Sequence, residues 1–292
     1  MKKDELWYFL LAGEVDAEMG SLGSFYAYGE HLGDALGKIM NAPLEFNFDN
    51  INLIEASLVD HSGLIDSENE LFEIAEHVYV QPTLISYPLN SPNKMFFSPV
   101  GIVASIPEGE YENNLIKENF FALNTNENGI FEFQLVLEKE HLIDTFIKTI
   151  EFLPTIEGCL IYVKNYWEND LTELWAANHF TDKPTVIDFL LQQKKNTLEN
   201  GYLDIVLYSS KGETNLMLDE HKKIRLQTKD SEVFSDFIGT IVALGYKQTI
   251  DFFSLEFGYN HIHYRPADSL TRNEFKQMLK AYGFELIDTR EE

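Results

Sequence analysis

Residues 129–208 constrain the fold of this chain more than any other stretch, because two apolar periodicities follow one another there. Apolar and mostly polar side chains alternate from Phe131 to Glu138, which is the period of a half-buried strand. From His141 the apolar spacing changes to three and four residues, as in a helix, and Pro154 ends it. The stretch predicts strand 131–138, helix 141–153, strands 159–163 and 174–180, helix 182–200 and strand 203–208.

This predicted order is that of a ferredoxin-like (βαββαβ) sandwich, in which two helices cover one face of an antiparallel sheet. Beyond residue 208 the pattern continues as β-β-α-β-β-α-β, and a capping box at Thr271 and Glu274 begins the last helix. Within this extension, residues 253–257 and 261–265 are expected to pair as a hairpin. The extension either widens the sheet or forms a second unit beside it. The predicted fold class is α+β, which hosts many unrelated functions.

A chain of 292 residues exceeds the usual size of one domain, so two domains are expected. Residues 107–129 are rich in Asn and Glu and lack periodicity, which is typical of a linker. Five of the nine prolines lie between residues 82 and 107, which favours edge strands and irregular connections before that linker. We therefore expect an acidic α+β domain over 1–106, a linker over 107–129 and the sandwich domain over 130–292.

Cysteine use and hydropathy predict the cellular setting. Cys159, the one cysteine, cannot form an internal disulfide, and it lies in an apolar run as a small buried hydrophobe does. The first apolar run, residues 6–12, is shorter than a signal peptide requires and leads into acidic residues. No run approaches the roughly 20 apolar residues of a membrane span. We expect a cytoplasmic protein without a membrane partner.

Acidic residues dominate the charge and are unevenly placed. The formal net charge is −26, and residues 1–93 carry half of it, with sixteen acidic and three basic side chains. Residues 39–93 contain no lysine or arginine. A field of this sign repels nucleic acid and anionic lipid, and it attracts basic partners. Acidity that only keeps the protein soluble is the alternative.

The lysine-free stretch supplies a candidate partner-binding surface. An acidic α+β protein without catalytic motifs resembles the immunity proteins that neutralise toxin nucleases in bacteria. The resemblance is one of composition and implies a class of function, a module that binds a basic protein. A short acidic helix is expected over 70–77. The carboxylates expected at the surface are Glu45, Asp49, Asp60, Asp66, Glu68, Glu70, Glu73 and Glu76.

His261 and His263 form the sharpest local motif. Two residues apart on a predicted strand, their side chains leave the same face, and Glu256 is expected across the hairpin. Two imidazoles with a carboxylate suit a hydrolase, which is the alternative function. Arg265 on the same face opposes a cation, and His221 lies at a predicted turn where exposure is expected. We therefore predict a polar strand face or a partner contact, without metal or cofactor.

A third possibility is a structural protein that forms a homodimer by joining sheet edges. The three hypotheses require different features. A partner-binding module needs its carboxylates on one contiguous face, a hydrolase needs the histidines gathered with a carboxylate, and the dimer needs an accessible edge strand.

Overall fold

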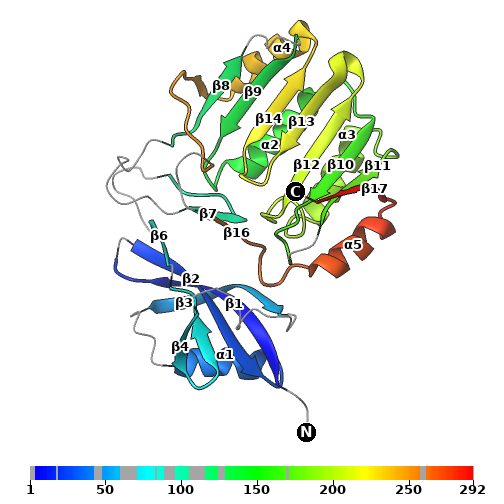
Figure 1. Cartoon of the computed structure of the whole chain (residues 1–292). Coiled ribbons are helices and arrows are strands. Elements are labelled where there is room, and N and C mark those ends of the chain that lie inside the picture. The colour runs from blue at the N-terminus through cyan, green and yellow to red at the C-terminus, as the bar shows by residue number, and fades with distance from the viewer. Residues whose placement is uncertain are drawn as a thin grey trace.

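The computed structural model describes residues 4–17, 19–42, 48–59, 71–82, 84–88, 96–104, 116–123, 129–168, 171–256 and 261–291. Within these residues the chain has an α+β fold, which confirms the predicted class, with five α-helices and two large sheets. A two-stranded ribbon lies between the two large sheets (Figure 1). No helix in this part of the chain is long and apolar enough to cross a membrane.

The first sheet is antiparallel and is built from the N-terminal part of the chain. Its strands are β1 (Glu5–Glu14), β2 (Met19–Gly29), β3 (Asp49–Leu58), β4 (Phe72–Ala75), β5 (Val78–Val80) and β6 (Ile85–Pro88). They follow the order β3-β1-β2-β5-β4, and β6 also pairs with β2. The helix predicted over 70–77 is wrong, because Phe72 to Ala75 pairs with β5 as a strand.

The two faces of the first sheet are covered by different elements. Helix α1 (Leu32–Asn41) packs on one face, where Phe9 and the helix residue Ile39 belong to the same apolar cluster. Leu10 points to the opposite face, because successive residues of a strand alternate. There it packs with Ile262 of the ribbon.

The second sheet has nine strands, with the order β15-β8-β9-β14-β13-β12-β10-β11-β17. Neighbouring strands are antiparallel except β15 and β8, which are parallel. The strands are β8 (Asn119–Leu123), β9 (Phe131–Val136), β10 (Gly158–Val163), β11 (Thr172–Ala177), β12 (Leu203–Ser209), β13 (Thr214–Leu218), β14 (Ile224–Thr228), β15 (Lys247–Gln248) and β17 (Glu285–Arg290). The helices are α2 (Leu142–Phe152), α3 (Lys183–Gln192), α4 (Ser231–Ala243), α5 (Arg272–Ala281) and the short 3-10 helix η1 (Lys211–Glu213).

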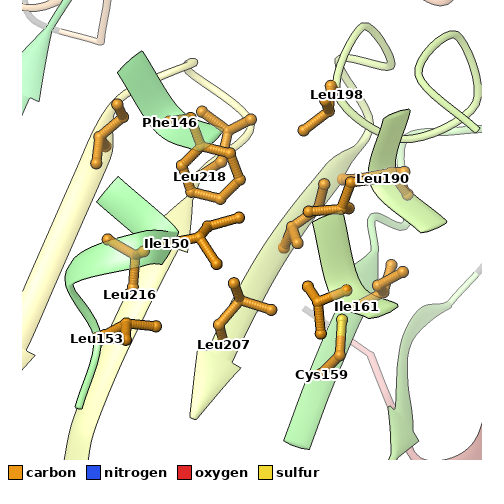
Figure 2. Packing of buried hydrophobic residues seen from close by; sticks show 14 of the residues in the cluster. Phe146, Ile150, Leu153, Cys159, Ile161, Leu190, Leu198, Leu207, Leu216 and Leu218 are labelled. Atoms are coloured by element: carbon orange, nitrogen blue, oxygen red, sulfur yellow. The ribbon is translucent and has the colours of Figure 1, made fainter. Parts of the chain in front are cut away.

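The main core lies between the second sheet and its α-helices. Figure 2 shows Phe146 and Ile150 of α2 packed near Leu207 and Leu216, which leave the strands toward the helices. Cys159 is fully buried in the same core, as predicted, and burial raises the pKa of its thiol to about 12. The predicted capping box at the start of α5 is also confirmed.

The strand order of the second sheet differs from the predicted ferredoxin-like sandwich. In that sandwich the first strand lies between the third and the fourth, so that two βαβ units interleave. Here the third and fourth strands, β11 and β12, flank the second strand, β10, and β9 lies next to neither of them because β13 and β14 separate it from β12. The β13–β14 hairpin enters the middle of the sheet because its apolar residues find partners on both sides, Leu216 opposite Leu207 and Leu226 opposite Phe133.

The ribbon pairs β7 (Ile102–Ala104) with β16 (His261–His263). The hairpin predicted between 253–257 and 261–265 is therefore wrong in the described residues, where 252–256 forms no strand. Strand β7 falls in the expected N-terminal domain, and β8 falls in the expected linker although it belongs to the second sheet. The domain boundaries stay a prediction, but segments on both sides of them share sheets.

Edge strand β17 of the second sheet has features that oppose pairing with another chain. A β-bulge interrupts its ladder with β11 between Leu174 and Trp175. The Asp288 carboxylate accepts hydrogen bonds from the Thr289 N–H and from the Arg290 side chain, so charged groups lie along this strand. Bulges and charges are common devices against edge-to-edge association. The homodimer stays a prediction.

Candidate metal centre

Three imidazoles meet where the ribbon faces the second sheet. His261 and His263 come from β16, and the alternation of that strand puts both on one face, as predicted, with Ile262 on the other. His221 comes from the turn between β13 and β14. The ring centroids are 5.0 Å apart for His221 and His261, and 5.1 Å apart for the other two pairs. Two distant parts of the chain thus build one cluster.

The turn that presents His221 is fixed by its own hydrogen bonds. Asp219 Oδ1 accepts from the Lys223 N–H at 2.8 Å, and the Asp219 carbonyl accepts from the Lys222 N–H at 2.9 Å. The Glu220 N–H donates to Asp204 Oδ1 at 2.8 Å, which ties the turn to the adjacent strand β12. Lys222 has a φ of 60°, which completes the tight return of the chain.

The spacing of the imidazole nitrogens suits a transition-metal ion. Each histidine offers one ring nitrogen, Nδ1 or Nε2, and these three nitrogens lie within 4.8 Å of one another. The Nε2 atoms of His221 and His261 are 3.3 Å apart. In a tetrahedral zinc site with Zn–N bonds of about 2.0–2.1 Å, two nitrogens are roughly 3.3 Å apart. This separation is that of a hydrogen bond between the two rings, and it is also the one that two ligands of one zinc ion require.

The far nitrogens of two rings face oxygen acceptors. His263 Nδ1 lies 2.8 Å from the Gly201 carbonyl, which can only accept, so Nδ1 carries the proton and Nε2 keeps a lone pair. His221 Nδ1 lies 3.6 Å from Glu256 Oε2 and 3.8 Å from Glu220 Oε1. Metal-binding histidines usually present their second nitrogen to a carbonyl or a carboxylate in this way.

Two of the imidazoles are held in the neutral form that binds metals. Burial lowers the pKa of His221 to about 4, although the charge of Glu256 raises it. Burial also lowers the pKa of His263 to about 3, and a positive charge on His221 adds to that effect. Both rings are therefore neutral at pH 7, and no proton has to leave them before they bind a cation.

Glu256 faces the Nδ1 side of His221 and is itself held by Lys223. The Lys223 ammonium donates to Glu256 Oε1, and it also lies 3.7 Å from Asp219 Oδ2. Burial raises the pKa of Glu256, but the hydrogen bond and the charge of Lys223, together with other nearby positive charges, hold the pKa below its usual value. The Glu256 carboxylate is thus ionised beside the His221 Nδ1, where it favours the tautomer that leaves Nε2 available.

Arg265 does not oppose a cation at this cluster, contrary to the expectation from sequence. Its side chain is directed toward the first sheet, where Nε lies 3.4 Å from Glu55 Oε1 and a terminal nitrogen donates to the Ala56 carbonyl at 3.2 Å. It also donates to the Ser269 carbonyl at 3.1 Å. The alternation that places His263 on the cluster face ends with β16, so Arg265 leaves in another direction.

A close contact between two glycines holds the ribbon against the start of β12. The Gly201 N–H donates to the Tyr264 carbonyl, and the Tyr264 N–H donates to the Gly101 carbonyl, each at 2.9 Å. A Cβ atom added to Gly201 would lie 1.8 Å from the Gly101 oxygen, so no other residue fits there. This contact brings the Gly201 carbonyl within reach of His263.

The expected acidic surface is less compact in the described residues. Asp49 begins β3, Glu73 lies in β4 and Glu76 lies in the following turn, and all three are exposed. Strands β3 and β4 are at opposite ends of the strand order of the first sheet. These three carboxylates do not gather at one edge. The other expected members, Glu45, Asp60, Asp66, Glu68 and Glu70, lie outside the described residues.

His221 is the residue that the sequence did not assign to the site. It was expected to be exposed at a turn, whereas its side chain is 16% exposed and lies against the two histidines of β16. The signal that was available is its place between two alternating apolar runs, which predicts a hairpin tip. The sequence did not show which element the tip would meet.

Comparison of the chain with protein-family models, with curated proteins and with solved structures gives no match. Because many functions share similar folds, the architecture alone does not decide between them. The functional argument therefore depends on the geometry of the three imidazoles and their neighbours.

Proposed function

We propose that this protein binds a divalent transition-metal ion, with zinc the best fit, through His221, His261 and His263. The observation that carries the proposal is the convergence of three imidazoles whose nitrogens lie within 4.8 Å of one another. The carbonyl beside His263 Nδ1 and the carboxylate beside His221 Nδ1 support it, because they leave Nε2 of each of these two rings available as a ligand. The sequence alone predicted no metal, and we now propose a metal site instead.

A site of this composition supports the hydrolase alternative. Among the described residues three ligands gather, and a zinc ion held by three protein ligands keeps a position for water, whose pKa it lowers to about 7. Glu256 lies on the Nδ1 side of His221, away from the point where the Nε2 atoms meet, so it orients a ligand and is poorly placed as the base. The net charge of −26 favours neutral or basic substrates over polyanions.

Metal analysis of the purified full-length chain tests the proposal. We expect one zinc or cobalt ion per chain, and each of His221→Ala, His261→Ala and His263→Ala should lower the affinity by more than about 100-fold, beyond the loss typical of changes behind a ligand. Competition with a chromophoric chelator measures that affinity. His179→Ala is the matched control, because His179 is exposed in the turn after β11. Stoichiometric binding that survives His221→Ala would contradict the proposed site.

A second proposal is that the acidic N-terminal part engages a basic protein, as the composition suggests. The lysine-free stretch over 39–93 and the exposure of Asp49, Glu73 and Glu76 support it. Strands β3 and β4 lie at opposite ends of the first sheet, so these carboxylates do not form one surface, and we therefore keep the metal site as the main functional proposal.

Cytoplasmic location is a prediction that agrees with the single buried cysteine.

A further inference from the structure

Glu55 is the buried carboxylate of the first sheet. It lies opposite Leu10 in the pairing of β3 with β1, on the face that packs against the ribbon, and it is 4% exposed. Burial raises the pKa of Glu55 to about 7, although the charge of Arg265 lowers it. A carboxyl group so far from water needs specific partners.

Those partners belong to two segments outside the first sheet. Glu55 Oε2 accepts a hydrogen bond from the Arg265 backbone N–H at 3.2 Å and another from the Tyr202 hydroxyl at 3.3 Å. Glu55 Oε1 lies 3.4 Å from Arg265 Nε. One carboxylate therefore joins the end of the ribbon to the start of β12.

Both partners are next to the groups that orient His263. Tyr202 follows Gly201, whose carbonyl is the acceptor for His263 Nδ1. Arg265 is two residues beyond His263, and the residue before it, Tyr264, accepts from the Gly201 N–H. Glu55 thus contacts both chain segments whose separation sets the direction of the His263 ring.

Aromatic contacts continue from Tyr202 to the same histidine. The Tyr202 ring stacks on Trp167 with centroids 5.4 Å apart, and it lies 5.8 Å from the ring of Tyr166. The Tyr166 ring is in turn 5.1 Å from His263. A displacement of Tyr202 would therefore change the packing of His263 as well as its hydrogen bond.

We propose that Glu55 is a positioning residue for the histidine centre, which holds Arg265 and Tyr202 and thereby directs His263 toward the other two imidazoles. Its effect on metal affinity rests on the proposed function, whereas its effect on the His263 ring does not. The first sheet is then part of the centre, although it supplies no ligand among the described residues. With a pKa of about 7, Glu55 is partly ionised at neutral pH, and loss of that charge would leave the buried Arg265 guanidinium without its counter-ion and would loosen both segments.

Cobalt titration of full-length variants tests the effect on the centre. Glu55→Gln should lower cobalt affinity about 10- to 100-fold and change the visible absorption bands that report ligand geometry. Tyr202→Phe removes one hydroxyl and keeps the ring, so it should cause a smaller change in the same direction. Glu73→Gln, an exposed carboxylate of the same sheet, is the matched control and should behave as the wild type. Wild-type affinity and bands in Glu55→Gln would overturn the inference.

The ¹⁵N nuclear magnetic resonance signals of the His263 ring test the positioning role of Glu55 even if no metal binds. In the metal-free wild type they should report one tautomer, protonated at Nδ1, and in Glu55→Gln a mixture of tautomers. An unchanged tautomer would overturn the positioning role, whereas a wild type that binds no cobalt would overturn only the metal proposal. If Glu55→Gln does not fold, Tyr202→Phe is measured by the same signals, and it must show the mixture.

Discussion

The histidine cluster and the acidic residues of the first sheet are both groups of polar side chains, but the protein holds them differently. The histidines come from β16 and from a distant turn, and their rings meet within 5.0–5.1 Å. Asp49, Glu73 and Glu76 are exposed and lie on different elements of one sheet. Partners that orient the side chains distinguish a built site from a charged surface, and His263 has one in the Gly201 carbonyl.

Gly201→Ala should have the largest effect, because it disrupts the backbone contact between Gly201 and Gly101 that holds the ribbon in place. The added Cβ would lie 1.8 Å from the Gly101 oxygen, so the ribbon must move. We expect the free energy of unfolding to fall by roughly 2–4 kcal/mol, measured by chemical denaturation, together with loss of metal binding.

Gly37→Ala is the control for this substitution. Nothing lies within 4 Å of a Cβ atom at Gly37 in α1, so alanine there should raise stability by roughly 0.5–1 kcal/mol through helix propensity. A Gly201→Ala protein as stable as the wild type would mean that the ribbon and the start of β12 are not in the contact described.

Glu256→Gln should have an intermediate effect, since it tests whether the groups behind the ligands matter. The Glu256 carboxylate lies 3.6 Å from His221 Nδ1, and a carboxamide lacks the charge that favours the protonated Nδ1. We expect zinc affinity to fall about 10- to 100-fold while the far-ultraviolet circular dichroism spectrum stays unchanged. Glu76→Gln, exposed and remote in sequence, should leave the affinity as it is. Equal affinities in the two variants would show that Glu256 has no orienting role.

The combined change of Asp49→Asn, Glu73→Gln and Glu76→Gln should have the smallest effect. Exposed residues of this kind usually change stability by less than about 0.5 kcal/mol, and zinc affinity should not change. Salt-dependent retention on immobilised poly-lysine measures the other possibility. If the triple variant loses most of that retention, the three acidic residues act together despite their positions. That result would favour binding of a basic protein as the main function.

Local features of the fold could be predicted from the sequence because their causes are local. The apolar period locates α2 and β9, Asp182 caps α3 through its hydrogen bond to the Thr185 N–H, and the Thr271 capping box begins α5. Strand order depends on contacts between residues that are far apart in the sequence. No local pattern therefore predicts that β13 and β14 lie between β9 and β12.

The site was predictable only in part for the same reason. The period of two places His261 and His263 on one face, which the sequence shows directly. The pairing of β16 with β7, at a separation of about 160 residues, decides that this face meets His221. Arg265 points away from the cluster and contacts Glu55 in the first sheet. No residue near Arg265 in the sequence indicates that contact.

The burial of Cys159 has a practical consequence for site-specific labelling of this protein. Because the one thiol of the chain is enclosed in the main core and its pKa is raised to about 12, it should not react with maleimide dyes at neutral pH. A cysteine introduced on the surface, for example by Glu168→Cys at an exposed turn, would then be the one labelled position. A fluorophore there would label the chain at a single known site without removal of any native residue from the interior.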